Sequence, residues 1–141
     1  MNAVTPDLPE FKTTFGPFRI VENNFAREWE FAGPMLVESL RDNKGTLTED
    51  DLLLKVLNRK AVLVVGQQSA LIFENAGFDR VLSVIFGHCG GNLDEVVQAH
   101  EILCMHFRAK GIEMAFIAGR DGWARALPGY EKFHTTYVKV L

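Results

Sequence analysis

The sequence has few of the features that mark disulfide-rich or metal-binding proteins. Its 141 residues include two cysteines, Cys89 and Cys104, and contain no CxxC or HExxH motif. The four histidines are scattered, and His100 and His106 are spaced so that they fall on different faces of a helix. The sequence therefore predicts neither a disulfide framework nor a metal site.

Long apolar runs and a basic surplus are also missing. No apolar run approaches the ~20 residues of a membrane-spanning helix, and residues 1–10 lack the basic start and apolar core of a secretory signal. The net charge is −3, from 15 basic and 18 acidic side chains, whereas nonspecific nucleic-acid binders usually carry a basic excess. We therefore expect a cytoplasmic protein with no membrane span and no nucleic acid as its main partner.

What is present is the composition of one folded domain. Apolar residues make up 48% of the chain and charged residues 23%, which argues against disorder. Residues 1–17 hold three of the five prolines and no sustained apolar period. The sequence therefore predicts an extended N-terminal arm over 1–17 and a single domain over 18–141.

The first half of this domain predicts one strand followed by two helices. Residues 18–21 form a strand candidate, and residues 25–40 carry apolar side chains at helical spacing. Because Gly33 and Pro34 interrupt that run, we expect a kink or two shorter helices. Thr48 is suited to cap a second helix whose first turn is acidic.

The middle of the chain changes to strand patterns. Residues 61–65, 70–74 and 80–86 are short apolar runs separated by turn residues, which predicts an antiparallel meander. A helix follows, with Asn92 as its N-cap and Lys110-Gly111 at its end. Its apolar stripe consists of Val96, His100, Leu103 and Phe107.

A strand over 112–118 follows this helix at once, so the two strands on either side of the helix should be parallel. A helical turn over 123–127 and a last strand over 136–140 complete the expected elements. The fold class is α/β (α+β), a mixed and mostly antiparallel sheet flanked by helices. The expected order is β-α-α-β-β-β-α-β-α-β.

This order, over residues 18–141, resembles the GNAT (GCN5-related N-acetyltransferase) fold, and Arg108-Ala109-Lys110-Gly111-Ile112 resembles the end of that family's third helix. The segment 119–130, with the sequence GRDGWARALPGY, resembles small acetyltransferase-like proteins encoded among the structural genes of tailed bacteriophages, including an internal virion protein of short-tailed phages.

The resemblance implies an acetyl-CoA site in the turn before the third helix. In the family this turn carries Q/R-x-x-G-x-G/A, whose main-chain N–H groups hold the pyrophosphate. Here the turn is 87–93, in which the Gln/Arg position is Gly87 and the G-x-G spacing is lost. The candidate cofactor-binding residues are Gly90, Gly91, Asn92 and Leu93. Asp94 and Glu95 add two negative charges that would oppose a pyrophosphate.

The candidate catalytic residues are Tyr130, Glu113 and His88. The resemblance offers Tyr130 as a general acid, although it could instead take only the place of the family's neighbouring aromatic residue. Glu113 and Glu74 could each accept a proton from an amine, or be ordinary exposed carboxylates. His88 precedes Cys89, but adjacent residues in a strand point apart, which speaks against a base–nucleophile pair.

Arg120, Trp123 and Arg125 combine cations with an indole, which is typical of a protein-binding surface; Trp123 could instead close the core. Two functions follow from the resemblance. The first is a noncatalytic virion structural or interaction module that binds other virion proteins or copies of itself, in the host cytoplasm or the virion. The second is an N-acetyltransferase that moves an acetyl group from acetyl-CoA to an amine.

Overall fold

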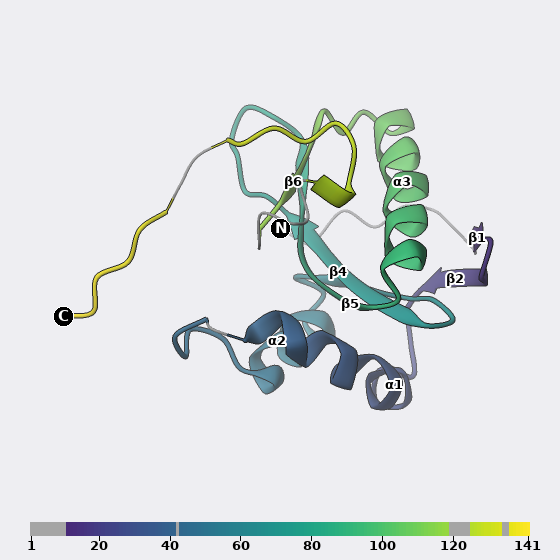
Figure 1. Cartoon of the computed structure of the whole chain (residues 1–141), viewed down its shortest axis with the longest axis horizontal. Helices are drawn as coiled ribbons and strands as arrows, with labels where there is room; N and C mark the ends of the chain where they lie inside the picture. The colour runs from purple at the N-terminus through teal and green to yellow at the C-terminus, as the bar shows by residue number, and fades with distance from the viewer. Residues whose placement is uncertain (1–10, 42, 119–124, 134–135) are drawn as a thin grey trace.

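The computed structural model describes residues 11–41, 43–118, 125–133 and 136–141, and consists of a curled sheet with helices on both faces (Figure 1). The strands are β1 (Phe11–Thr13), β2 (Gly16–Ile20), β3 (Val62–Val65), β4 (Ser69–Asn75), β5 (Ser83–Gly91) and β6 (Met114–Ile117). The helices are α1 (Phe25–Val37), the 3-10 turn η1 (Glu38–Leu40), α2 (Glu49–Leu57) and α3 (Leu93–Ala109).

The strands lie in the order β1-β2-β3-β4-β5-β6. Neighbouring strands are antiparallel except β5 and β6, which are parallel because α3 crosses between them. The antiparallel meander and the parallel crossover predicted from the sequence are thereby confirmed.

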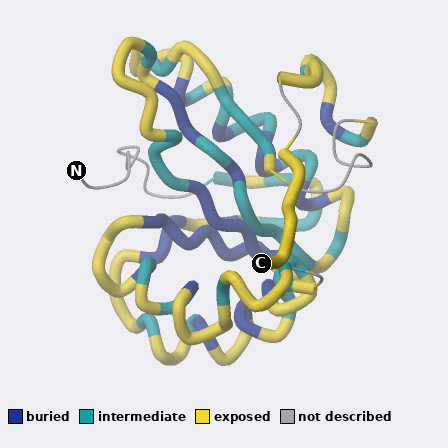
Figure 2. The backbone as a smooth tube through the Cα atoms, turned by 90° about the vertical axis from the view of Figure 1, so that its left-hand side faces the viewer, coloured by how far each residue is buried: buried dark blue, intermediate teal, exposed yellow. Residues whose placement is uncertain are grey.

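The sheet is buried on both faces, which explains why β3 and β4 are continuously apolar (Figure 2). Val62, Val64, Leu71 and Phe73 belong to a core that α3 covers. Their sequence neighbours, which include Leu63, Val65 and Ile72, belong to a second core under α1 and α2. Val96, Leu103 and Phe107 of α3 are buried in the first core, as its stripe predicts.

Helix α1 continues through Gly33 and Pro34 to Val37, so the expected division into two helices at this point is wrong. The chain changes to 3-10 geometry only at Glu38. Gly33 permits a polar contact between the helices, because a Cβ there would lie 2.8 Å from Trp29 Nε1. That nitrogen donates to Glu49 Oε1 of α2 at 3.1 Å.

The predicted cap of α2 is confirmed. The hydroxyl of Thr48 accepts a hydrogen bond from the N–H of Asp51, and the carboxylate of Asp51 accepts one from the N–H of Thr48. Asn92 caps α3 by accepting from the N–H of Glu95, without the return hydrogen bond that is present at α2. These local signals lie within one turn of chain, which is why the sequence shows them plainly.

The two ends of the domain differ from the sequence pattern. Residues 11–13, in the expected arm, pair with β2, and Phe11 stacks against Phe18 and His106; residues 1–10 lie outside the described part. The predicted last strand over 136–140 is wrong, since residues 136–141 are exposed and pair with no described strand. Of the expected turn over 123–127, residues 125 and 126 are helical, and 123 and 124 are not described.

Candidate active site

A β-bulge interrupts β5 near its centre. Phe86 pairs with Phe73 and His88 pairs with Ile72, so Gly87 is an extra residue with no partner on β4. The pairing of β5 with β6 ends at the same level, with Phe86 opposite Ile117. β5 then continues to Gly91, whereas the sequence predicts a loop from residue 87. Bulges of this kind re-aim side chains and are frequent next to active sites.

His88 follows the bulge and points toward α1 and η1. Its Nδ1 lies 2.9 Å from Ser39 Oγ, and that hydroxyl donates to the carbonyl of Leu36 at 2.6 Å. When the hydroxyl proton is donated to Leu36 O, Ser39 accepts from Nδ1–H, since a hydroxyl has only one proton. In that arrangement Nε2 carries the lone pair, and no described residue forms a hydrogen bond with it.

Two charged side chains act on this imidazole. Lys55 Nζ lies 3.3 Å from Oε1 of Glu74, the next-to-last residue of β4, whose side chain is on the same face of the sheet. Burial lowers the pKa of His88, the charge of Lys55 lowers it further, and Glu74 opposes this with a smaller rise. His88 is therefore neutral near pH 7, which is the state that a general base requires.

Cys89 lies on the opposite face, packed against the core under α3. Burial raises the pKa of its thiol to about 12, so Cys89 is not a thiolate at neutral pH. The structure therefore separates His88 from Cys89, as the alternation of side chains along a strand requires.

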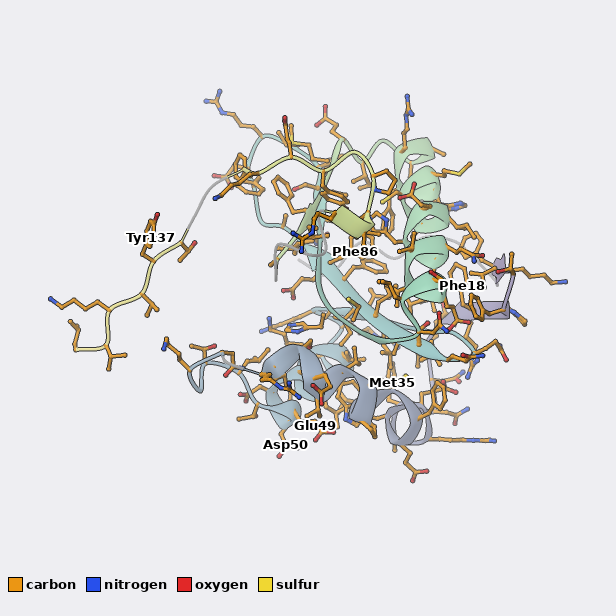
Figure 3. All side chains as sticks on the ribbon, in the orientation of Figure 1. Phe18, Met35, Glu49, Asp50, Phe86 and Tyr137 are labelled. Atoms are coloured by element: carbon orange, nitrogen blue, oxygen red, sulfur yellow. The ribbon has the colours of Figure 1, made fainter. Side chains whose placement is uncertain are left out.

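The glycines before α3 are in contact with α1. A Cβ on Gly90 would lie 2.0 Å from the main-chain oxygen of Met35, and one on Gly91 would lie 2.2 Å from that of Gln68. Figure 3 shows Met35 on α1, on the side of the sheet away from α3. Packing of α1 thus accounts for Gly90, and the turn between β3 and β4 accounts for Gly91, so the space beside both Cα atoms is filled by protein.

Only Asn92 separates β5 from α3. Its N–H donates to Gln68 O at 2.8 Å while its side chain caps the helix. In the first turn, the N–H groups of Leu93 and Asp94 have no acceptor among the described residues. These two donors, at the positive end of a 17-residue helix, could hold one phosphate group.

Glu95 points away from that helix end into the protein. It is fully buried, and its carboxylate accepts from the N–H of Gln67 at 2.9 Å, the N–H of Gln68 at 2.8 Å and the hydroxyl of Ser69. It therefore fastens the turn between β3 and β4 to α3, and three donors compensate its charge. Asp94 is then the exposed acid of this turn.

Tyr130 belongs to a second polar cluster, on the α3 face of the sheet. Its hydroxyl lies 2.7 Å from His100 Nε2, and Cys104 Sγ lies 3.4 Å from the same nitrogen. His100 Nδ1 lies 3.2 Å from Glu101 Oε1. Burial raises the pKa of Tyr130, which keeps the phenol protonated. The structure therefore does not bring Tyr130 and His88 together on one face.

Among the described residues, no other sequence candidate forms a hydrogen bond or ion pair with His88. Glu113 is exposed, and its N–H donates to Leu82 O before β6 begins. Arg125 is exposed, whereas Arg120 and Trp123 lie outside the described residues. Ser39 was not predicted, because nothing in a helical stretch indicates that its hydroxyl meets a strand 49 positions later.

Comparison with solved structures shows the GNAT fold. A probable acetyltransferase superposes with a TM-score of 0.60 at 12% identity, over 87% of this chain and 99% of the other. An aminoglycoside acetyltransferase from an uncultured soil metagenomic sample, in complex with sisomicin, gives 0.57 at 12% identity, over 88% and 96%. A possible acetyltransferase from Clostridium difficile 630 gives 0.51 at 9% identity, over 88% and 97%.

No protein-family model matches the chain, and no curated protein matches its sequence. Among the described residues, no helix is both long and apolar enough to cross a membrane, and no group of His, Cys, Asp and Glu side chains could hold a metal ion.

Proposed function

We propose that this chain is an N-acetyltransferase that transfers an acetyl group from acetyl-CoA to an amine, with His88 as its general base. The observation that carries the proposal is the contact between His88 Nδ1 and Ser39 Oγ. With the hydroxyl proton donated to Leu36 O, Ser39 accepts from Nδ1–H, which leaves the Nε2 lone pair beside the bulge at Gly87. The acetyltransferase names of the structural neighbours support the same chemistry.

The residues of the chain fit the two ends of acetyl-CoA unequally. At the acyl end, β5 beyond Phe86 has a main-chain edge that β6 does not pair with. At the phosphate end, the fit is limited to the N–H groups of Leu93 and Asp94, since Gly90 and Gly91 face Met35 and Gln68. We therefore expect weak cofactor binding, with Asp94 lowering the affinity further.

The residues on the α1 face would act on the acceptor amine. The neutral His88 takes the proton that the amine loses on becoming a nucleophile. Acetyl-CoA supplies an activated acyl carbon, at which a C–N bond forms as the C–S bond breaks. The departing thiolate then takes up a proton from solvent, since Tyr130, the sequence candidate for a general acid, lies against His100 on the α3 face of the sheet.

The test is an assay of CoA release by chromatography, with primary amines that include aminoglycosides, polyamines and lysine peptides. His88→Gln should lower kcat/KM by about 100-fold or more, since a general base contributes roughly 10²–10⁴-fold. Cys89→Ser is the matched control, because that side chain faces the opposite side of the sheet. Equal loss in both variants would show damage to β5 rather than loss of a base.

A second candidate is a noncatalytic interaction module of the virion type. The absence of catalysis is supported by the contact of Gly90 with Met35, which fills the place where a cofactor would need open backbone, whereas the virion role rests only on the sequence resemblance of residues 119–130. This hypothesis predicts that acetyl-CoA produces no thermal shift at any concentration, and that no amine is acetylated. A ligand at about 100 times its Kd stabilises a protein by ~2.7 kcal/mol, so binding would be visible.

A further inference from the structure

A row of side chains crosses β4, β5 and β6 on the face of the sheet that carries His88. Glu74 pairs with Ile85, and Ile85 pairs with Phe116; residues paired directly across a sheet share a face. His88 pairs with Ile72, two positions before Glu74 on β4, so it belongs to the same face. With strands ~4.8 Å apart and a rise of ~3.3 Å per residue, the Cα atoms of His88 and Phe116 are about 8 Å apart.

Aromatic rings, rather than α1 and α2, cover this end of the face. Among the described residues, the buried strand residues of the core under these helices come from β3 and β4, and none comes from β5 or β6. The ring of Phe116 instead contacts Phe78, with centroids 5.0 Å apart, and Phe133, with centroids 5.3 Å apart. Phe78 and Phe133 are 6.1 Å apart, and they are 48% and 63% exposed. These three residues, the aromatic cluster, present apolar surface to solvent next to His88.

The charges around His88 give a polycation little attraction. Among the described residues, Lys55 and Glu74 are the charged side chains that act on His88, and they pair with each other at 3.3 Å. Because the two charges largely cancel, an acceptor gains little from its own net charge at this place. It gains more from apolar contact with the aromatic cluster, whose exposed rings lose contact with water when a ligand covers them.

We propose that the acceptor is an arylalkylamine, with its ring against the aromatic cluster and its amino group at His88 Nε2. The distance from Phe116 to His88 fits an aliphatic linker of about two or three carbons between ring and nitrogen. A ligand ring stacks on exposed phenylalanine rings in offset or edge-to-face geometry, which adds to the gain from burial. This inference rests on the proposed acetyltransferase function and names the class of its acceptor.

The reaction balances with an acceptor that enters as an ammonium ion. The ammonium gives one proton to His88 Nε2, and the neutral amine then forms a C–N bond with the acetyl carbon as the C–S bond of acetyl-CoA breaks. The nitrogen loses a second proton to solvent, from which the CoA thiolate takes one. His88 finally returns its own proton to solvent. The products are the N-acetylated arylalkylamine, CoA as a thiol and one proton.

Steady-state kinetics of CoA release tests the proposal with two amines, phenethylamine and n-propylamine, which differ in the ring. We expect the KM of the parent for phenethylamine to be at least about tenfold lower than for n-propylamine. Phe133→Ala should raise the KM for phenethylamine about tenfold and leave its kcat and the KM for n-propylamine unchanged, because it removes contacts to the ring alone. Phe78→Ala should act in the same way. Phe31→Ala is the matched control, since Phe31 is 45% exposed on α1 and does not belong to the aromatic cluster.

The outcomes separate this proposal from the proposed function. Acetylation of polyamines or aminoglycosides without acetylation of phenethylamine would overturn the aromatic acceptor and leave the acetyltransferase standing. A rise in KM that is equal for both amines in Phe133→Ala would also overturn it, since a purely structural role predicts that result.

If no amine is acetylated, the proposed function fails, and calorimetry with phenethylamine decides about the aromatic cluster separately. Binding that Phe133→Ala weakens about tenfold and Phe31→Ala leaves unchanged would support recognition of an arylalkylamine. An absence of binding, or binding that Phe133→Ala does not change, would overturn it.

Discussion

A Cβ atom on Gly90 would lie 2.0 Å from the main-chain oxygen of Met35, so α1 packs directly on the backbone of β5. We expect Gly90→Ala to destabilise the protein by about 1–3 kcal/mol, because either the strand or the helix must shift. Urea unfolding measures this. The control is Gly87→Ala, since a Cβ at Gly87 meets no atom within 4 Å. Equal effects in the two variants would mean that the contact with Met35 is not the cause.

Glu95→Gln should also destabilise the protein, by about 1–3 kcal/mol, because an amide can accept at only one of its two terminal atoms, whereas the carboxylate accepts at both from Gln67, Gln68 and Ser69. Asp94→Asn, one position away and exposed, should be nearly neutral. Chemical denaturation measures the free energy of unfolding of both variants. A neutral Glu95→Gln would show that the turn between β3 and β4 holds without this carboxylate.

The same pair of variants bears on cofactor binding. Since Glu95 is buried and compensated, Asp94 is the acid whose charge a phosphate at the start of α3 would meet. Asp94→Asn should therefore raise the affinity for acetyl-CoA, most clearly at low salt, where screening is weakest. Calorimetry at two salt concentrations measures the dissociation constant of acetyl-CoA for the parent and the variant. If acetyl-CoA binds and Asp94→Asn leaves its affinity unchanged, the phosphates do not lie at the start of α3.

The stability of the protein should fall as the pH drops below neutrality. Burial lowers the pKa values of both His88 and His100 in the folded state, so the unfolded chain takes up protons first, near the ordinary value of 6.5. Unfolding is then favoured as the pH falls through that value. His88→Asn should reduce the slope of stability against pH between about pH 8 and about pH 5. A slope unchanged from the parent would contradict the buried neutral state of His88.

Both cysteines should be slow to alkylate in the folded protein. Burial raises the pKa of Cys89 to about 12 and that of Cys104 to about 11, and only the thiolate reacts. We expect iodoacetamide to modify the native protein roughly 100-fold more slowly than the urea-unfolded chain at pH ~8. Cys89→Ser and Cys104→Ser assign the rates to each residue. Fast native modification of either thiol would contradict its burial.

The sequence by itself determined the elements whose signals are local. The caps at Thr48 and Asn92 each involve residues within one helical turn, and the stripe Val96, Leu103 and Phe107 marks the buried face of α3. The continuous apolar run of β3 indicates a strand covered on both sides. Together with the tight connection from α3 to β6, these signals were sufficient to predict the meander, the parallel crossover and the GNAT-like fold.

Only the tertiary structure decided how the site is built. Gly90 in the sequence is compatible with an open cofactor turn, and its contact with Met35 exists because α1 is folded against β5. The tautomer of His88 depends on Ser39, and the role of Glu95 depends on a turn 26 to 28 positions earlier in the chain. Residues 136–140 alternate like a strand, yet a strand forms only where an edge accepts its hydrogen bonds. Such long-range contacts leave no periodic trace in the sequence, because they join residues whose spacing along the chain is set by folding alone.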